Sequence, residues 1–264
     1  MKPFDRVIGI GCSFTHGGGL EVPSVYEHYT KNTWNELDAE LFKYKNNYIG
    51  QLAKKLNIPF ENLSDGGISN EVILEKAYER FNKNKKVSDD SQNVLLIIQT
   101  SFFHRIRMFK IDEEFKKLIS HNLLIPYDDK SIVNCSPEIL YEPRKTEFIN
   151  NRSKEYSHIL DIYENILKYS YNEHLEQKKL LQQINVHIMW LRSKNVTTII
   201  LPYQFYGTDT SEVLLIDNMD LGELMDKNNL LIRDIPECGH NDMHFSLEGH
   251  AFIANKLYNY IQTL

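Results

Sequence analysis

A serine near the start of the sequence has the surroundings of a catalytic nucleophile. Ser13 ends the short sequence Gly-Cys-Ser, which directly follows an apolar run, and the glycines Gly17–Gly19 come soon after it. Small residues permit a tight turn that presents one hydroxyl at the carboxyl end of a strand, where open α/β sheets bind ligands. A serine hydroxyl attacks a carbonyl only when a base takes its proton, so Ser13 requires a partner.

The best candidate for this base among the ten histidines is His244. It lies just before a predicted helix at residues 246–261, with Asp242 two positions before it and Asn241 three positions before it. An acid beside the imidazole holds the ring in one orientation and stabilises the imidazolium that forms when the serine loses its proton. Ser13 and His244 together therefore predict acyl transfer through a covalent serine intermediate.

The sequence around these residues resembles the conserved blocks of the SGNH, or GDSL, hydrolases, and the resemblance extends over residues 5–260. The Gly-Asp-Ser block of that family is matched by Gly-Cys-Ser, with Ser13 in the nucleophile's place. The Asp-x-x-His block is matched at His244, with Asn241 where the acid normally lies. Asp242 is one residue closer to the histidine. Either residue could orient the ring, and the carboxylate of Asp242 is the favoured one.

The same resemblance implies an oxyanion hole. Gly67 matches the glycine that gives its backbone N–H to the oxyanion, with Gly66 as the alternative. Ser101 stands where the family has an asparagine, after a buried strand, and Asn70 is a further candidate for substrate binding. A serine hydroxyl reaches less far than an asparagine amide, and loss of one oxyanion donor costs about 3 to 4 kcal/mol of transition-state stabilisation.

The resemblance implies a serine hydrolase of the esterase type that acts on a small acyl ester, such as an O-acetylated carbohydrate. If a sugar hydroxyl replaced water as the acceptor, the protein would be an O-acyltransferase. A third hypothesis is a binding or assembly module that keeps the fold with weakened catalysis, which the departures at Ser101 and Asn241 favour. The joint presence of Ser13, Gly67 and His244 favours an enzyme.

Short apolar runs separated by helical patterns predict an α/β fold. The runs at Val7–Ile10, Val94–Ile98 and Val196–Leu201 have the composition of buried parallel strands, with a weaker candidate at Leu230–Ile232. The family resemblance specifies a three-layer α/β/α sandwich around a mostly parallel, flavodoxin-like sheet. We expect residues 1–264 to form a single domain.

Helical spacing of apolar residues predicts helices at Tyr48–Leu56 and Glu71–Phe81, the second with Asn70 as its N-cap. Residues Ser153–Arg192 have the same spacing over a length that fits one long helix or two. Residues 120–151 are rich in turn formers and predict an active-site lid or a surface insertion.

Composition excludes several other functions. The formal net charge is −6 with both signs interspersed, so we expect no nucleic-acid partner. No apolar stretch is long enough for a membrane span. The three cysteines lack the spacing of metal ligands and predict reduced thiols in a cytoplasmic protein, with Cys12 buried. The oligomeric state cannot be predicted.

We expect neither a metal nor another cofactor. His240 and His250 could join His244 and Asp242 in a metal site, but the position of His250 within the final helix disfavours this. The glycines after Ser13 lack the spacing of a nucleotide-binding loop.

Three basic residues follow the apolar run at Val94–Ile98: His104, Arg105 and Arg107. A guanidinium at this sheet edge could recognise a carboxylate or a phosphate on a substrate. A solvated loop or an internal salt bridge is the favoured interpretation of this segment.

Overall fold

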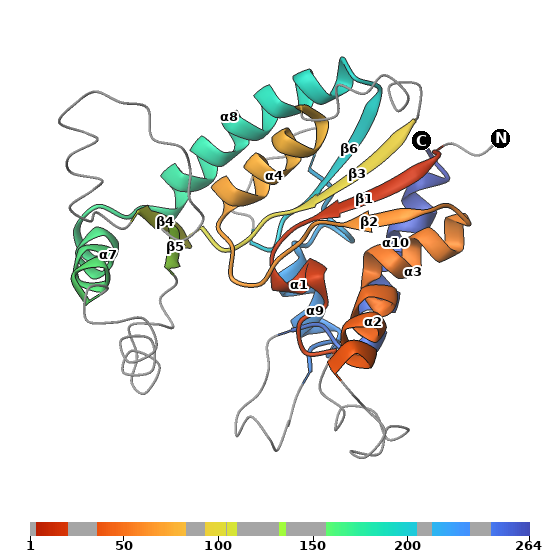
Figure 1. Ribbon diagram of the computed structural model, residues 1–264, viewed down its shortest axis with the longest axis horizontal. Helices are drawn as coiled ribbons and strands as arrows, with labels where there is room; N and C mark the ends of the chain where they lie inside the picture. Colours follow the sequence, from red (N-terminus) through yellow and green to blue (C-terminus); the bar gives the residue numbers. More distant parts are fainter. Residues whose placement is uncertain are drawn as a thin grey trace.

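The computed structural model describes residues 4–20, 36–82, 93–103, 105–109, 132–135, 157–204, 213–232 and 244–264. Four strands form its central sheet: β1 (Arg6–Ile10), β2 (Phe60–Asn62), β3 (Val94–Gln99) and β6 (Val196–Leu201). All of them are parallel, in the order β2-β1-β3-β6 (Figure 1). The expected α/β fold with a parallel, flavodoxin-like sheet is confirmed.

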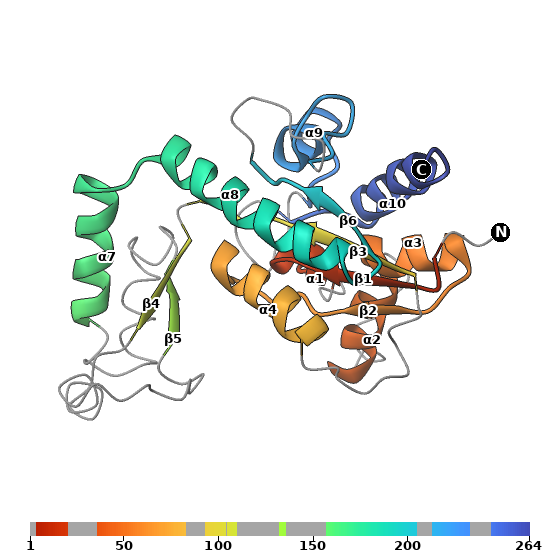
Figure 2. The same cartoon turned by 90° about the horizontal axis from the view of Figure 1, so that it is seen from above.

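Helices cover both faces of this sheet, which explains why β1, β3 and β6 are rich in apolar residues. On one face lie α2 (Glu36–Asn46), α3 (Tyr48–Leu56) and α10 (Leu247–Ile261), and on the other lie α4 (Asn70–Asn82) and α8 (Glu173–Arg192) (Figures 1 and 2). All six residues of β3 are buried between these layers. The close contact of α3 with the sheet requires Gly9, where a Cβ would lie 2.4 Å from Ile49.

The strand order places a topological switch point between β1 and β3. From β1 the chain moves outward to β2, and from β2 it crosses back over β1 to β3. The connections that leave β1 and β3 therefore diverge, and open α/β sheets bind ligands at such a point, outside the carboxyl ends of the strands. Ser13 follows β1 and Ser101 follows β3, so the fold brings both residues to this edge.

The structure refines several predicted elements. Residues Leu230–Ile232 are not a strand of the sheet, because Leu231 makes only an isolated bridge with Phe245. The long helical segment is two helices, α7 (Ser157–Tyr169) and α8, and α8 begins after Asn172, whose side chain accepts a hydrogen bond from the Leu175 N–H. Strand β2 was not predicted, since three half-buried residues have too little apolar periodicity.

A second, antiparallel pair of strands lies to one side of the main sheet, beside α7 (Figure 2). It consists of β4 (Ile106–Phe109) and β5 (Ile132–Cys135). Strand β5 falls within the predicted lid or insertion at 120–151, and the rest of that segment lies outside the described residues. No helix among the described residues has the length and apolarity needed to cross a membrane.

Candidate active site

Ser13 lies where β1 turns sharply into α1 (Ser13–His16). Cys12 has an extended backbone, and its carbonyl accepts hydrogen bonds from the N–H groups of Thr15 and His16, both at 3.0 Å. The Ser13 carbonyl accepts from the Gly18 N–H at 2.8 Å, so the following glycines fold back over the turn. As the first residue of a helix, Ser13 has a backbone N–H with no intrahelical acceptor. This half-buried residue therefore combines a hydroxyl with a spare backbone donor.

A buried polar network fixes this turn to the sheet and to α3. The Thr15 hydroxyl donates to Gln99 Oε1 at 2.8 Å and, with its proton so used, accepts from the Tyr48 hydroxyl at 2.7 Å. The Cys12 thiol, which is fully buried as expected, also donates to Gln99 Oε1 at 3.4 Å. Burial raises the pKa of Tyr48, so its phenol remains a donor. Sequence patterns gave no indication of this network.

Breaking this network is expected to destabilise the protein in a non-additive way. Thr15→Val leaves the buried Tyr48 hydroxyl without an acceptor, and Tyr48→Phe removes the donor instead. Each single change should lower the free energy of unfolding by about 1 to 3 kcal/mol, and the double variant should lose less than the sum of the two. Urea unfolding of the four proteins measures this coupling. Strict additivity would contradict the shared hydrogen bond.

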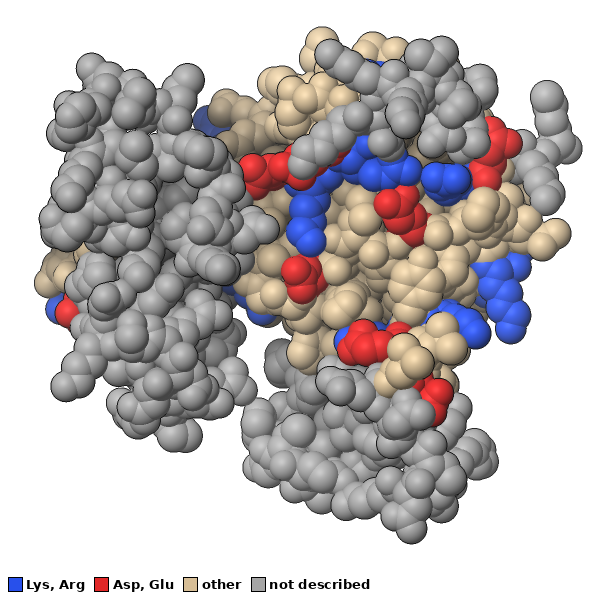
Figure 3. All heavy atoms as spheres, in the orientation of Figure 1, with Lys and Arg blue, Asp and Glu red and all other residues tan. Residues whose placement is uncertain are grey.

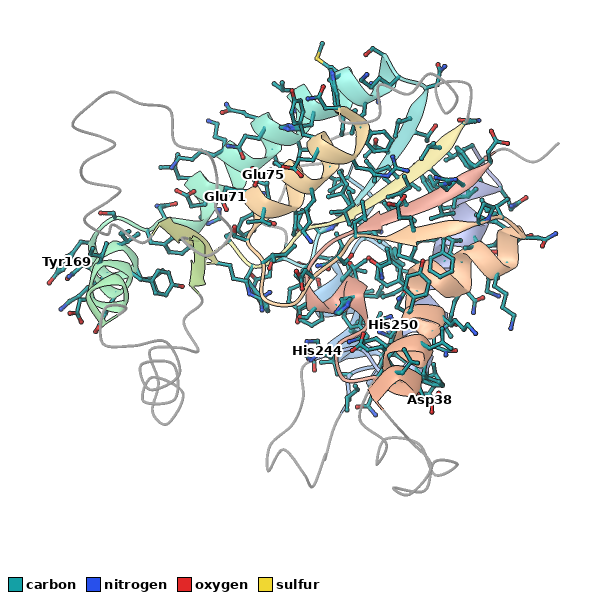
Figure 4. The ribbon with its side chains drawn as sticks, viewed as in Figure 1. Asp38, Glu71, Glu75, Tyr169, His244 and His250 are labelled. Carbon is teal, nitrogen blue, oxygen red and sulfur yellow. The ribbon has the colours of Figure 1, made fainter. Side chains whose placement is uncertain are left out.

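His244 lies against the glycine turn that begins at Ser13 (Figure 4). A Cβ at Gly18 would be 2.8 Å from His244 Nε2, and the imidazole ring centre is 5.2 Å from that of Phe14. The Ile232 N–H donates to the His244 carbonyl at 2.8 Å and holds this backbone in place. No hydrogen bond joins Ser13 Oγ to His244 among the described residues, and catalytic hydrogen bonds often form only in the substrate complex.

The orienting residue of His244 is not placed by the structure. Asn241 and Asp242 lie outside the described residues, as does His240. The choice of Asp242 over Asn241 therefore stays a prediction.

The loop after β2 is fastened beside the Ser13 turn. Its Leu63 and Asp65 N–H groups donate to the carbonyls of Gly9 and Gly11, at 2.8 and 3.1 Å. Further along this loop, the Gly66 N–H donates to Asp65 Oδ1 at 2.8 Å, whereas the exposed Gly67 has a positive φ of 72° and its N–H has no acceptor among the described residues. Of the two glycines, only Gly67 thus keeps a spare donor for an oxyanion.

Ser101 and Asn70 are joined to each other. Asn70 Oδ1 accepts from the Ser101 N–H at 2.7 Å, and Asn70 Nδ2 donates to the Ser101 carbonyl at 3.2 Å. Asn70 is the first residue of α4 and not its N-cap, because its side chain bonds to Ser101. Ser101 itself is fully buried, and its Oγ accepts from Arg105 Nη1 at 3.0 Å. Asn70 therefore acts here as a positioning residue for the end of β3.

An aromatic cluster packs beneath the Ser13 turn. Phe14 stacks on Tyr203 with ring centres 4.2 Å apart, and Phe102 meets the same Tyr203 ring edge-on at 4.6 Å. Phe245 adds a ring 5.1 Å from Phe14. Burial raises the pKa of Tyr203, which keeps its hydroxyl protonated. Phe102 and Tyr203 follow buried strands at the sheet edge, which is the one signal that could have identified them from the sequence.

His250 is a buried structural histidine. Its Nδ1 accepts the Tyr48 N–H at 3.1 Å, and its Nε2 has no partner among the described residues. Desolvation, with a smaller contribution from His244, lowers the pKa of His250 to about 3. The described residues contain no group of three potential metal ligands.

This neutral imidazole makes stability depend on pH. In the unfolded chain a histidine has a pKa near 6.5, so below that pH the unfolded state binds a proton that the folded state does not. The contribution of His250 is therefore fully present above pH 6.5 and falls by about 1.4 kcal/mol per pH unit below it, until the folded pKa is reached. His250→Gln, which keeps an acceptor for Tyr48, should remove this part of the slope in urea unfolding at pH 5 and 7.5. An unchanged slope would contradict the assignment.

Comparison with solved structures gives matches of low sequence identity. A lipolytic protein of the G-D-S-L family from Desulfitobacterium hafniense DCB-2 is 12% identical over 97% of this chain and 98% of that one, with a TM-score of 0.38. Phospholipase A1 from Streptomyces albidoflavus NA297 is 10% identical over 98% and 99%, with a TM-score of 0.42. A carbohydrate esterase is 15% identical over 98% of this chain and 65% of that one, with a TM-score of 0.36.

No family model matches the sequence, and no relative was found among curated proteins. At these identities and TM-scores the matches carry no conclusion about activity. The proposed function therefore rests on the side chains of the candidate site.

Proposed function

We propose that the protein is a serine hydrolase of the esterase type, acting on a small acyl ester. The observation that carries this proposal is the position of His244 Nε2 against Gly18, on the turn that begins at Ser13. A histidine beside a serine at the switch point of a parallel sheet is an arrangement that supports nucleophilic catalysis. The buried network under Thr15 supports it further, because nucleophiles must be held in a fixed geometry.

In the proposed reaction, Ser13 Oγ attacks the ester carbonyl while His244 takes its proton. The oxyanion accepts hydrogen bonds from the Ser13 and Gly67 N–H groups. His244 then gives its proton to the departing alcohol, leaving an acyl group on Ser13. Water, deprotonated by His244, attacks the acyl carbonyl and releases a carboxylic acid and free Ser13.

An O-acetylated carbohydrate is the proposed substrate. A sugar hydroxyl in place of water at the second step would make the protein an O-acyltransferase. The burial of Ser101 is the one observation that favours the third candidate, a binding module with weakened catalysis, because its hydroxyl and backbone N–H both face protein groups. An oxyanion hole without that donor would depend on backbone N–H groups alone.

Two measurements on the purified protein test the proposal together. Hydrolysis of p-nitrophenyl acetate reports turnover, and a fluorophosphonate probe reports an activated serine, which peptide mapping should locate at Ser13. Labelling of the native protein that disappears after denaturation supports the hydrolase. If the folded protein neither labels nor hydrolyses the ester, the esterase proposal fails and the binding module takes its place.

A further inference from the structure

A polar cavity of about 250 Å³ lies beside the candidate active site, on the face of the sheet that α4 and α8 cover. Its lining residues come from the start of α4, the first half of α8 and the segment after β3: Asn70, Glu71, Phe103, Arg105, Glu176, Lys179, Leu180 and Gln183. Two of them, Asn70 and Arg105, hydrogen-bond to Ser101. The cavity therefore adjoins the end of β3 but contains neither Ser13 nor His244.

Arg105 carries a charge in this cavity that no described carboxylate neutralises. Its Nη1 donates to Ser101 Oγ at 3.0 Å, and its Cζ lies 5.0 Å from the centre of the Phe102 ring. Its Nε is buried and has no partner among the described residues. The sequence favoured a solvated loop or an internal salt bridge for this segment, and Arg105 makes no salt bridge among the described residues. A half-buried charge without a counterion costs folding free energy, and a bound anion would offset that cost.

Three other cations on α4 and α8 have counterions. Arg80 pairs with Glu61 at 2.9 Å, and Lys76 with Asp65 at 3.7 Å. On the face seen in Figure 3, positive and negative side chains lie next to each other. Within the cavity, Lys179 pairs with Glu176 at 2.6 Å. Arg105 is therefore the lining cation that a bound anion would neutralise.

The cavity also offers groups that accept hydrogen bonds. Glu71 lies at the start of α4 (Figure 4) and makes no ion pair among the described residues. Gln183 adds an amide from α8. A simple inorganic anion would gain nothing from the Glu71 carboxylate, which would repel it. A ligand with an acid group for Arg105 and hydroxyl or ammonium donors for Glu71 would use both.

We infer that this cavity binds a small carboxylate that also carries hydrogen-bond donors, with Arg105 as the ligand of its acid group. The planar guanidinium suits a carboxylate, and Glu71 and Gln183 accept from the neighbouring donors. The volume fits a group no larger than about one monosaccharide, since pockets for larger ligands span roughly 300–1,000 Å³. The acid is either part of the ester substrate, which rests on the proposed function, or a separate ligand.

Binding to the full chain tests the inference without turnover. Calorimetric titration with sodium glucuronate should show binding, and methyl glucoside, which has the hydroxyls but no carboxylate, should not bind. Arg105→Gln should weaken glucuronate binding about tenfold or more, as loss of a charge-assisted hydrogen bond predicts. Arg80→Gln is the matched control and should leave the affinity unchanged.

Folding of the variants is checked by thermal unfolding in parallel, and Arg105→Lys keeps the charge without the planar fork. Equal binding of the two sugars, or unchanged affinity in folded Arg105→Gln, would overturn the inference. The source of the acid follows from kinetics: a lower KM for O-acetylated methyl glucuronate than for O-acetylated methyl glucoside identifies it as part of the substrate. Equal KM values, with glucuronate binding intact, identify a separate ligand. If the esterase proposal failed, Arg105-dependent binding of glucuronate would still support this inference.

Discussion

Replacing Ser13 by alanine is expected to abolish fluorophosphonate labelling and to reduce ester hydrolysis by a factor of about 10³ or more. In the proposed mechanism Ser13 Oγ forms the acyl bond, so its removal should prevent the covalent intermediate. Loss of a serine or its histidine in such pairs costs up to about 10⁶ in kcat, with the remainder supplied by binding and the oxyanion hole. Steady-state kinetics and intact-protein mass measure the two effects.

His244→Ala should produce a loss of similar size, because the serine then has no base, and the double variant should be no worse than either single one. Ser193→Ala and His187→Ala are matched controls, since both residues lie on or next to α8, away from the site. Activity in Ser13→Ala equal to that of the parent would place the nucleophile elsewhere.

Gly18→Ala is expected to lower kcat by about 10²-fold while the protein stays folded. The added methyl carbon would lie 2.8 Å from His244 Nε2 and 2.9 Å from its Cδ2, so the imidazole must move. Displacing a catalytic group by about 1 Å can cost two orders of magnitude in rate. The KM should change little, because the proposed oxyanion donors, the Ser13 and Gly67 N–H groups, are retained. Kinetics on p-nitrophenyl acetate give both constants.

Gly66→Ala is the matched control for this variant. A Cβ at Gly66 would have nothing within 4 Å, and the backbone N–H that bonds to Asp65 is retained. Its rate should equal that of the parent. If Gly18→Ala kept full activity, His244 would not act as the base from the position seen in the structure.

The central sheet was predictable because β3 is buried throughout and β1 and β6 are mostly buried, so all three contain runs of apolar residues. Helix α3 was predicted with the bounds that it has, since its one apolar face repeats every three to four residues. Strand β2 is short and lies at the edge, where burial is partial, so its residues have no such pattern. Tertiary pairing with β1, and not local propensity, makes it a strand.

The residues of the candidate site also fall into two groups, those with a local sequence signal and those without one. Ser13 and His244 could be proposed because each occupies a short motif with a chemical requirement of its own, and Gly67 because the family resemblance implies it. The bonds of Asn70 to Ser101, and of Arg105 to Ser101, join positions on separate elements, and no sequence period predicts such side-chain contacts. The network of Thr15, Tyr48 and Gln99 escaped prediction for the same reason.

Under the proposed mechanism, Ser13 gains its base only when His244 reaches Gly18. During synthesis the serine turn emerges early and the histidine segment late. The hydroxyl of Ser13 therefore stays an ordinary alcohol until the segment ahead of α10 docks against the glycines. Under the proposed mechanism, we therefore expect partly made or locally opened chains to be inert toward esters.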